Sequence, residues 1–444
     1  GQGATITHEL LSSNELYGTH TDFRDTIDEV SSYLPALDPP LSTVMYPEFH
    51  FSSNSCRKLT RDELHDTQKP YLSQLHYAQL AHFAFQVALC AVWEGKCISP
   101  DVIFGHSLGE YAGAVCAGVF SLESATTMIY TRAKIIMQMS PDWEEGVMVA
   151  MRTTRDAAQD AIEALHASSH VAIAAVNGEE SVVISGIAKE TWKVVKHLGV
   201  SHKALDTGGI AYHSPQVSAA VVAYEKSLNH LLNTGKISFL QTKRVTITDT
   251  LGSARADGNA CKIISCMTGQ NIAVKDMKNA NYWCKQMAST VQALDSLLSV
   301  LNSKKAGIER CIEMGVGSTL IDLCKTVLKT TSSSSGFSKR RLELTPSTGA
   351  RISELHGGGV TSFTTALASV LPALFGKKGG RKNALYKPIA LPWRQMSSDT
   401  FSTSSEIVEK AGSLLTKELS TSVLATTQKC VYAALPEKNV ANSW

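Results

Sequence analysis

The stretch Val102-Ile103-Phe104-Gly105-His106-Ser107-Leu108-Gly109 is the most informative part of this sequence. An apolar triplet, typical of a short buried strand, leads into Gly-His-Ser-Leu-Gly, which matches the G-x-S-x-G pattern of a nucleophile elbow. Residues 110–117 are small and mostly apolar and predict a helix directly after the turn. Glycines permit such a tight turn, and the helix dipole favours negative charge that develops near Ser107. Ser107 is therefore the candidate nucleophile, and the alternative is a chance match at an ordinary strand-to-helix turn.

The composition narrows the class of protein. The 444 residues carry a net charge of +2 and 18% charged residues, which gives no reason to expect nucleic acid or an anionic membrane as a partner. The sequence has no uninterrupted apolar run of about 20 residues, the length that a membrane-crossing helix needs. The ten cysteines form no C-x-x-C pair, which argues against zinc and against a disulfide framework. We therefore expect reduced thiols and a cytoplasmic location, or an organelle stroma or lumen with reducing conditions.

Periodicity divides the chain into segments. Apolar residues at helical spacing predict helices over 71–95 and from Ser121, a plausible N-cap, onward. From Gly146 to about residue 206 the patterns follow the order strand, helix, strand, strand, helix, strand, which is the ferredoxin-like signature. Further helices are predicted over 216–232, 291–302 and 319–329. Beyond residue 397 the chain is rich in Ser and Thr, and we expect it to lie outside the main fold.

A base must take the proton of a serine before the serine becomes a good nucleophile. Among the fourteen histidines, His213 stands out because Gly208 and Gly209 precede it and Pro215 follows it, so that it lies on a fixed loop. His106, by contrast, is adjacent to Ser107, and neighbouring side chains point away from each other. The alternative is that His213 only caps the helix predicted over 216–232.

Arg132 is the second unusual residue. It lies three positions beyond Ile129 on the apolar stripe of its predicted helix and should therefore face inward. Burying an unpaired charge is costly, so this guanidinium needs a partner. A structural ion pair with an internal carboxylate is the commoner arrangement. An anionic substrate is the alternative, because the fork of the guanidinium binds a carboxylate through two hydrogen bonds. Periodicity alone leaves both open.

Taken together, the motifs resemble the malonyl-CoA:acyl carrier protein transacylases, and specifically the acyltransferase domains of polyketide and fatty acid synthases. The order and approximate spacing agree across roughly residues 1–330, and the segment ending Leu391-Pro392-Trp393-Arg394 resembles the linker that follows such domains. The matching stretches are Gly1-Gln2-Gly3, Tyr77-Ala78-Gln79, Gly105-His106-Ser107-Leu108-Gly109-Glu110-Tyr111, Ala117-Gly118-Val119-Phe120-Ser121-Leu122-Glu123, Thr131-Arg132-Ala133, Val176-Asn177-Gly178, Ser181-Val182-Val183-Ile184-Ser185-Gly186, Ala211-Tyr212-His213-Ser214-Pro215, Thr268-Gly269, Tyr282-Trp283 and Glu313-Met314-Gly315.

The resemblance assigns roles to individual residues. It implies that Ser107 carries the acyl ester and that His213 is the general base and acid. A main-chain carbonyl, implied to be that of Gln286, would orient this histidine in place of a third, acidic residue. The backbone N–H groups of Gln2 and Leu108 would form the oxyanion hole. The residues implied to bind substrate are Arg132, which would take the free carboxylate of a malonyl-type group, and Gln79, His106, Asn177 and Tyr212.

The resemblance also implies a fold and partners. The expected fold is α/β, with a hydrolase-like parallel-sheet core over 1–145 and 209–330 and an inserted ferredoxin-like subdomain over 146–208. A linker over 331–396 and a partly disordered C-terminal extension over 397–444 would follow. The expected partners are malonyl-CoA, an acyl carrier protein with its phosphopantetheine, and an adjoining ketosynthase, with no bound cofactor or metal. Tyr212 beside His213 favours malonyl over methylmalonyl, since an aromatic ring leaves little room at the α-carbon.

The sequence departs from the family pattern in several places. The chain starts at the Gly-Gln-Gly turn, so we expect it to be part of a longer polypeptide and to lack the first core strand. Insertions are predicted somewhere in 5–70, around 241–262 and over 330–358, and Val316 stands where the family typically has Pro. The main functional alternative is a serine hydrolase or thioesterase of the α/β-hydrolase type, because G-x-S-x-G serves both. A non-catalytic scaffold domain is the other alternative, and the presence of Ser107, His213 and Arg132 argues against it.

Overall fold

The structure is a computed structural model, and it describes residues 14–34, 36–50, 61–95, 100–240, 261–301, 310–316, 319–334 and 343–348. Gln2 lies outside the described residues, as do the predicted C-terminal extension over 397–444 and most of the predicted linker over 331–396. The two parts of this linker that are described are the end of one helix and one strand.

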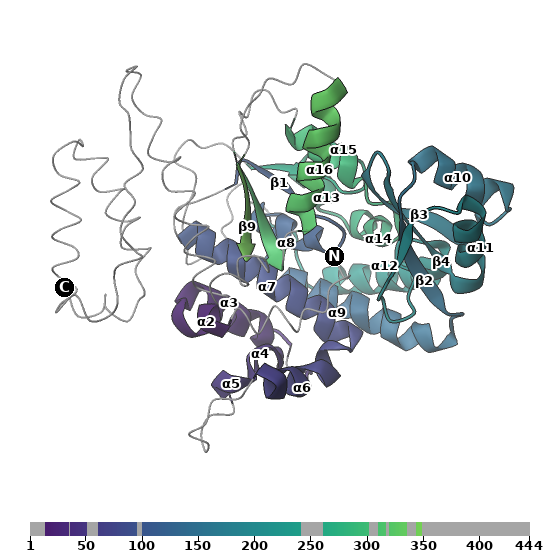
Figure 1. Ribbon diagram of the computed structural model, residues 1–444. Helices are drawn as coiled ribbons and strands as arrows, with labels where there is room; N and C mark the ends of the chain where they lie inside the picture. Colours follow the sequence, from purple (N-terminus) through teal and green to yellow (C-terminus); the bar gives the residue numbers. More distant parts are fainter. Residues whose placement is uncertain are drawn as a thin grey trace, which may run out of the picture.

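All described strands lie after residue 100, where they are interspersed with helices, and the described part before it is helical (Figure 1). The helices are α2 (Asn14–Thr19), α3 (Thr21–Ser32), α4 (Leu41–Met45), α5 (Pro47–His50), α6 (Arg61–Leu72), α7 (Leu75–Gly95), α8 (Gly109–Cys116), α9 (Leu122–Met139), α10 (Arg155–Ala164), α11 (Ala188–Leu198), α12 (Ser218–Asn233), α13 (Val274–Met277), α14 (Ala280–Ala288), α15 (Ala293–Leu301) and α16 (Thr319–Ser334), with short 3-10 turns η2 (Ser140–Asp142) and η3 (Pro215–Val217). The strands are β1 (Val102–Phe104), β2 (Gly146–Met151), β3 (Val171–Gly178), β4 (Ser181–Ile187), β5 (His202–Leu205), β6 (Lys262–Ile264), β7 (Asn271–Ile272), β8 (Arg310–Val316) and β9 (Glu343–Thr348).

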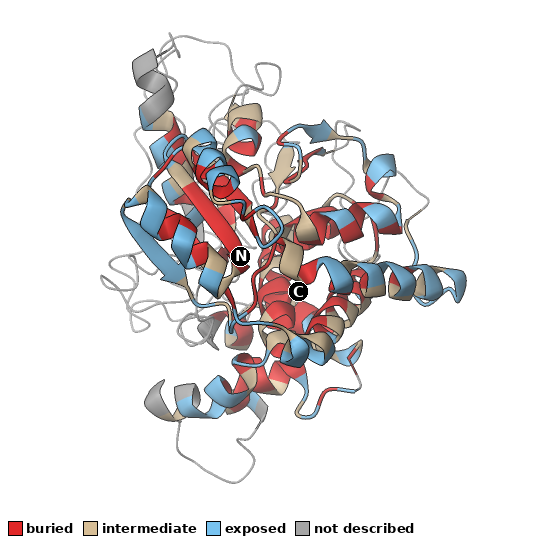
Figure 2. Cartoon of the chain, turned by 90° about the vertical axis from the view of Figure 1, so that its right-hand side faces the viewer, coloured by how far each residue is buried: buried red, intermediate tan, exposed pale blue. Residues whose placement is uncertain are grey.

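The larger part of the fold is built around α7. This helix contacts α3, α6, α8, α9 and β8, and the buried residues gather between these elements (Figure 2). By length and composition α7 is apolar enough to cross a membrane, with a mean hydropathy of 1.2, but 72% of its apolar window is buried inside the fold. It therefore serves as the central core helix, which explains why apolar residues occupy nearly all of its faces.

Short parallel pairs of strands lie beside this helical core. Strand β1 pairs in parallel with β6, and β8 pairs in parallel with β9. The β1–β6 pair directly precedes the Gly-His-Ser-Leu-Gly turn, since β1 ends at Phe104. Strand β9 falls within the segment that was predicted to be an insertion over 330–358 and part of the linker over 331–396. Its pairing with β8 joins this part of the segment to the core.

The smaller part runs from β2 to β5 and lies at the right of Figure 1. Its four strands form an antiparallel sheet in the order β3-β4-β2-β5, and α10 and α11 contact this sheet. The apolar residues of the strands and helices form a separate buried cluster that includes Val149, Ile162, Ile184 and Val194. The order strand, helix, strand, strand, helix, strand with this pairing confirms the predicted ferredoxin-like subdomain within an α/β fold.

A loop of the larger part pairs with the sheet of the small subdomain. It follows α14, and its Val291 exchanges main-chain hydrogen bonds of 2.9 Å with β3, to the carbonyl of Ala174 and from the N–H of Val176. The Thr290 hydroxyl donates to the carbonyl of Ile173 over 2.7 Å. The position of the small subdomain on the core is therefore tied to the C-terminal end of α14.

Trp283 anchors α14 in the core. Its ring is fully buried, with centroids 4.4 Å from Tyr111 and 5.0 Å from Phe120, and its indole N–H donates to the carbonyl of Met277 over 2.9 Å. We expect Trp283→Ala to lower the free energy of unfolding by about 3–5 kcal/mol. The substitution removes the apolar contacts and the hydrogen bond of the indole ring and leaves a cavity in the core. Trp192, which is 40% exposed, is the control. Trp192→Ala should cost about 1 kcal/mol or less.

Urea unfolding followed by circular dichroism measures both variants. Equal losses for Trp283→Ala and Trp192→Ala would contradict this account of the core.

Candidate active site

The turn between β1 and α8 places Ser107 in a strained conformation. Its φ is +52°, in the left-handed region that non-glycine residues rarely adopt, and such strain is typical of functional sites. The turn is closed by main-chain hydrogen bonds of 3.0 Å from Gly109 to His106 and from Glu110 to Ser107. A Cβ atom at position 105 would lie 2.4 Å from the backbone of Glu110, so only glycine fits there. The pattern is thus a true elbow.

Ser107 and His213, which are 106 positions apart in the sequence, form a hydrogen-bonded dyad. The distance from Ser107 Oγ to His213 Nε2 is 2.7 Å. On the other side of the ring, Nδ1 lies 2.8 Å from the carbonyl oxygen of Ser289. A carbonyl can only accept, so Nδ1 carries the proton and donates it, and Nε2 is left to accept from the serine hydroxyl. This is the geometry that a serine nucleophile and its base require.

The carbonyl that orients His213 belongs to Ser289 and not to Gln286, so the expectation for Gln286 is wrong in this respect. Gln286 lies inside α14, whereas Ser289 directly follows the helix with extended backbone angles, φ −76° and ψ 150°. An extended residue at a helix end points its carbonyl away from the helix axis, which leaves it available to the histidine. Gln286 contacts the dyad through its side chain instead, with Nε2 donating to the main-chain carbonyl of Ser107 over 2.7 Å.

The loop that carries His213 is fixed by its neighbours. Ser214, and not His213, caps the following turn η3, because its hydroxyl accepts from Gln216 N over 3.2 Å and donates to the carbonyl of Ala211 over 2.7 Å. The Gln216 side chain accepts from Ala211 N over 2.6 Å and donates to the carbonyl of Glu144 over 2.7 Å. His213 itself has a φ of +56°. Its side chain is thereby held toward the elbow.

The dyad histidine is uncharged near neutral pH. Burial lowers the pKa of His213 to about 3, and the positive charges of Arg132 and His106 contribute to the same shift. Burial is also the main cause that lowers the pKa of His106 to about 4. A neutral imidazole can accept the proton of Ser107, whereas a protonated one cannot.

Arg132 is buried without an internal carboxylate. Its side chain lies on α9, is 2% exposed, and forms no ion pair with any acidic residue in the described part of the chain. Its Nε and Nη1 atoms are buried and have no hydrogen-bond partner among the described residues. Its positive charge contributes to the lowered pKa of His213, so the guanidinium and the dyad histidine interact electrostatically. Of the two possibilities left by the sequence, the described structure favours an anion from outside.

The remaining predicted site residues lie as follows. His106 Nε2 is 3.1 Å from Oδ1 of Asn177 on β3, so these two residues connect the elbow to the small subdomain. Gln79 on α7 is fully buried, and neither polar atom of its amide has a partner among the described residues. Tyr212 is 3% exposed and directly precedes His213. Leu108 is the N-cap of α8, and within the described residues its N–H makes no main-chain hydrogen bond.

A buried polar cluster that was not predicted from the sequence lies behind the elbow. Glu110 on α8 is 1% exposed and contacts Cys266 and Tyr282. The signal was present: Glu110 is the charged residue at the start of an otherwise apolar helix. Like Arg132, a charged side chain that faces inward needs partners. Within the described residues, no group of three or more His, Cys, Asp or Glu side chains is arranged to hold a metal ion.

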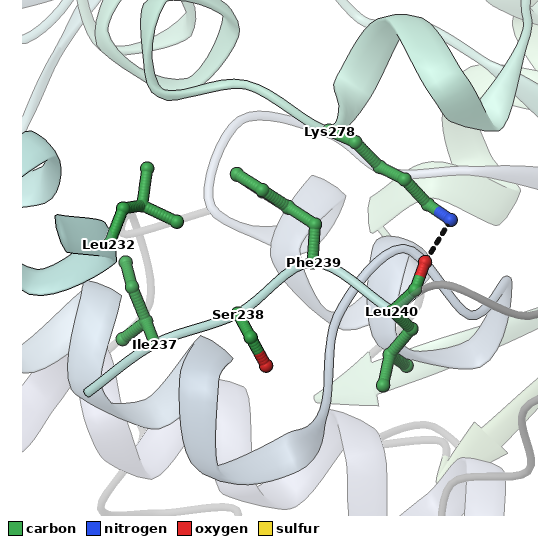
Figure 3. A pocket seen from close by; sticks show the side chains of 6 residues that line it. All are labelled: Leu232, Ile237, Ser238, Phe239, Leu240 and Lys278. Atoms are coloured by element: carbon green, nitrogen blue, oxygen red, sulfur yellow. Dashed lines mark hydrogen bonds between the residues drawn. The ribbon is translucent and has the colours of Figure 1, made fainter. Parts of the chain in front are cut away.

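A separate hollow lies away from these residues. It has a volume of about 400 Å³ and is lined by the C-terminal end of α12, the segment after it, and Lys278 (Figure 3). The ammonium of Lys278 donates a hydrogen bond to the carbonyl of Leu240 at its edge. None of the predicted site residues lines this hollow, so it is not the site of the dyad.

On this fold, the hydrogen-bonded pair of Ser107 and His213 has the arrangement that enzymes with a serine nucleophile use. Among solved structures, the acyltransferase domain from the second module of the salinomycin polyketide synthase matches with a TM-score of 0.61 and 22% identity, over 83% of this chain and 74% of that chain. MCAT from Streptococcus pneumoniae matches with a TM-score of 0.58 and 20% identity, over 78% of this chain and 93% of that one. These similarities establish the fold, a hydrolase-like core with a ferredoxin-like subdomain.

The chain belongs to the acyl transferase domain family, whose profile matches residues 12–335, and it is an acyltransferase. The PKS-NRPS hybrid synthetase ATPKS of Aspergillus niger is 28% identical over 324 residues, which are 72% of this chain and 15% of that protein. Polyketide synthase GfsA of Streptomyces halstedii is 30% identical over 251 residues, which are 56% of this chain and 3% of that protein. The chain therefore spans only a small part of these curated relatives.

The two glycines of the elbow allow a matched test. We expect Gly105→Ala to abolish covalent labelling of Ser107 by phenylmethylsulfonyl fluoride, because the added Cβ would overlap the backbone of Glu110 and open the turn. Gly109→Ala should be labelled nearly as fast as the unmodified protein, since its Cβ would only meet the Gln86 side chain at 3.7 Å. Intact mass spectrometry follows the adduct. Similar labelling of both variants would show that the elbow does not depend on the close approach at Gly105.

The pKa of His213 predicts an unusual pH profile. Because the neutral form of His213 persists far below its usual pKa of 6.5, we expect the rate of Ser107 labelling to stay level from about pH 8 to about pH 5. A histidine with the usual pKa would lose about thirtyfold over the same range. In Arg132→Ala the pKa of His213 should rise, and the decline should begin at higher pH. A midpoint near 6.5 in the unmodified protein would contradict this electrostatic account.

Proposed function

We propose that this acyltransferase loads a malonyl-type extender unit from coenzyme A, through an ester on Ser107, onto the phosphopantetheine thiol of an acyl carrier protein. The single observation that carries this proposal is Arg132, a buried guanidinium that interacts electrostatically with His213 and whose Nε and Nη1 atoms have no partner among the described residues. A carboxylate on the acyl group would supply the missing partner, because it accepts two parallel hydrogen bonds from a guanidinium. An uncharged acyl group would leave the buried charge uncompensated.

In the first half-reaction, Ser107 Oγ attacks the thioester carbonyl while its proton passes to His213 Nε2. The bond from the carbonyl carbon to oxygen forms, the bond to sulfur breaks, and His213 gives the proton to the departing coenzyme A thiolate. In the second half-reaction, the phosphopantetheine thiol gives its proton to His213 and attacks the ester. The proton then returns to Ser107 Oγ as the ester bond breaks.

The developing oxyanion needs donors at the elbow. The Leu108 N–H supports this role, because it lies at the N-terminus of α8 beside the nucleophile and is not engaged by the main chain of the described residues. The N–H of Gln2 is the proposed second donor. A substrate carboxylate beside Arg132 would also offset the positive charge that lowers the pKa of His213, so binding would make this residue a stronger base.

Several other groups support a binding role for the acyl unit. The fully buried Gln79 offers an amide whose donor and acceptor are both unpartnered among the described residues, which suits a polar malonyl group. His106 and Asn177 span the elbow and the small subdomain and would border the acyl chain. Tyr212 next to the base is buried and bulky, which favours malonyl over methylmalonyl at the α-carbon. We propose these four as substrate-binding residues with Arg132.

The setting of this activity is also a proposal. The relatives named above are synthases of which this chain matches a small segment. We therefore propose that the chain works within a polyketide or fatty acid synthase, next to a ketosynthase and other domains, with no bound cofactor. A cytoplasmic location, or an organelle with reducing conditions, accords with the free thiols of its described cysteines.

Incubation with malonyl-CoA tests the proposal. We expect a malonyl ester on Ser107 by intact mass spectrometry, transfer to a holo acyl carrier protein on its addition, and a larger malonyl than methylmalonyl adduct when both thioesters compete. Arg132→Ala should lose malonyl loading at least about tenfold while accepting acetyl-CoA better, because the carboxylate loses its partner. Arg152→Ala, which removes an exposed arginine from the small subdomain, is the matched control and should load normally.

Two other outcomes would contradict the proposed function. Rapid loss of the acyl group to water without transfer would indicate a serine hydrolase. Undiminished malonyl loading by Arg132→Ala would show that Arg132 does not bind the carboxylate.

A further inference from the structure

Helix α14 contacts both members of the dyad. Near its C-terminal end, the fully buried Gln286 donates from Nε2 to the main-chain carbonyl of Ser107 over 2.7 Å. Directly after the helix, the carbonyl of Ser289 accepts from Nδ1 of His213 over 2.8 Å. The amide orientation of Gln286 follows from the first contact, since a carbonyl can accept only from a donor. One rigid element therefore holds the nucleophile on one side and the base on the other.

The cluster behind the elbow holds Gln286 and α14 in place. Glu110 Oε1 accepts from Tyr282 Oη over 2.7 Å and from Cys266 N over 3.0 Å, and its Oε2 accepts from the Cys266 thiol over 3.0 Å. Gln286 Nε2 lies 3.7 Å from Cys266 Sγ. Tyr282 and Gln286 are four positions apart on α14 and so share a face, which this cluster joins to the first turn of α8.

We propose that Gln286 is a positioning residue for acyl transfer, supported by the thiol of Cys266 and the carboxylate of Glu110. Ser107 has a left-handed backbone, which the surrounding structure must enforce. The Gln286 amide holds the main chain of Ser107 from outside the elbow, and it does so from the helix whose following residue, Ser289, accepts from His213. The separation of Ser107 Oγ and His213 Nε2 thus depends on this network. The inference rests on Ser107 being the residue that is acylated.

This network is distinct from the groups proposed to bind substrate. Gln286, Cys266 and Glu110 contact the main chain and one another, on the side of the elbow that faces β6 and α14. Arg132 lies on α9 and is not hydrogen-bonded to them in the described structure. Disturbing the network should therefore slow the chemical step and leave the affinity for the thioester unchanged.

Gln286→Leu is the decisive variant, and Gln68→Leu is its matched control. Gln68 is also fully buried, and its Nε2 also donates to a main-chain carbonyl over 2.7 Å, that of Met45, but it lies on α6 without contact to the dyad. Single-turnover acylation by malonyl-CoA gives a limiting rate and a half-saturating concentration. We expect Gln286→Leu to lower the limiting rate about 10- to 100-fold, because misplacing reacting groups by about 1 Å costs this much. Its half-saturating concentration should not change.

Gln68→Leu should keep both values, although it loses the same kind of hydrogen bond. The labelling rate with phenylmethylsulfonyl fluoride, a neutral reagent that forms a bond to Ser107 Oγ and releases fluoride, should fall in parallel for Gln286→Leu. Circular dichroism establishes the folded fraction of each variant. If Gln286→Leu does not fold, the pair Cys266→Ala and Cys266→Ser replaces it. We then expect the alanine variant to lose limiting rate and the serine variant, which keeps a donor to Glu110, to recover it.

The outcomes separate the two proposals. If unmodified protein reacts with phenylmethylsulfonyl fluoride but not with malonyl-CoA, the proposed substrate is wrong and the positioning role is still tested by the neutral reagent. If folded Gln286→Leu acylates as fast as Gln68→Leu, or if only its half-saturating concentration changes, the positioning role is wrong. Equal limiting rates for Cys266→Ala and Cys266→Ser would likewise overturn the role of the thiol.

Discussion

The hydrogen bond of 2.7 Å between Ser107 Oγ and His213 Nε2 is the interaction on which the proposed chemistry of this fold depends. Both residues have left-handed backbone, with φ of +52° and +56°, and such conformations persist only where the surroundings enforce them. The elbow is enforced by the close approach of Gly105 to the next helix, and the His213 loop by hydrogen bonds of Ser214 and Gln216. Much of the local structure around the site therefore holds these two residues in their left-handed conformations.

Helix α14 and the loop after it link the dyad to the rest of the molecule. The buried Trp283 ring fixes the helix against α8, and the main chain of Val291 pairs with β3 of the small subdomain. Asn177, which also lies on β3, forms a hydrogen bond with His106 next to Ser107. The two parts of the fold are therefore joined at the site itself. A shift of the subdomain would displace the elbow, because protein interiors are closely packed and transmit such movements.

Much of the fold could be predicted from sequence because its elements have strong local signals. The ferredoxin-like order, the Ser121 cap and the central apolar helix are each set by periodicity or by one capping residue, and the structure confirms them. The helices α2 to α6 were not predicted. For residues 5–70 the only prediction was that they contain an insertion. Strand β9 was also missed, because pairing with β8 is a long-range contact that no local pattern of a Ser-rich stretch reveals.

The sequence by itself determined the elbow, its candidate nucleophile and the loop with the candidate base, since glycine, proline and serine at fixed spacing restrict the backbone locally. Only the tertiary structure decided which carbonyl orients His213. That choice depends on where α14 ends and which way Ser289 points. The tertiary structure also decided that Arg132 meets no carboxylate in the described chain, and that Glu110 and Gln286 both contact Cys266 behind Ser107. Contacts between residues that are far apart in the sequence depend on how the helices and strands pack together, which local sequence patterns do not specify.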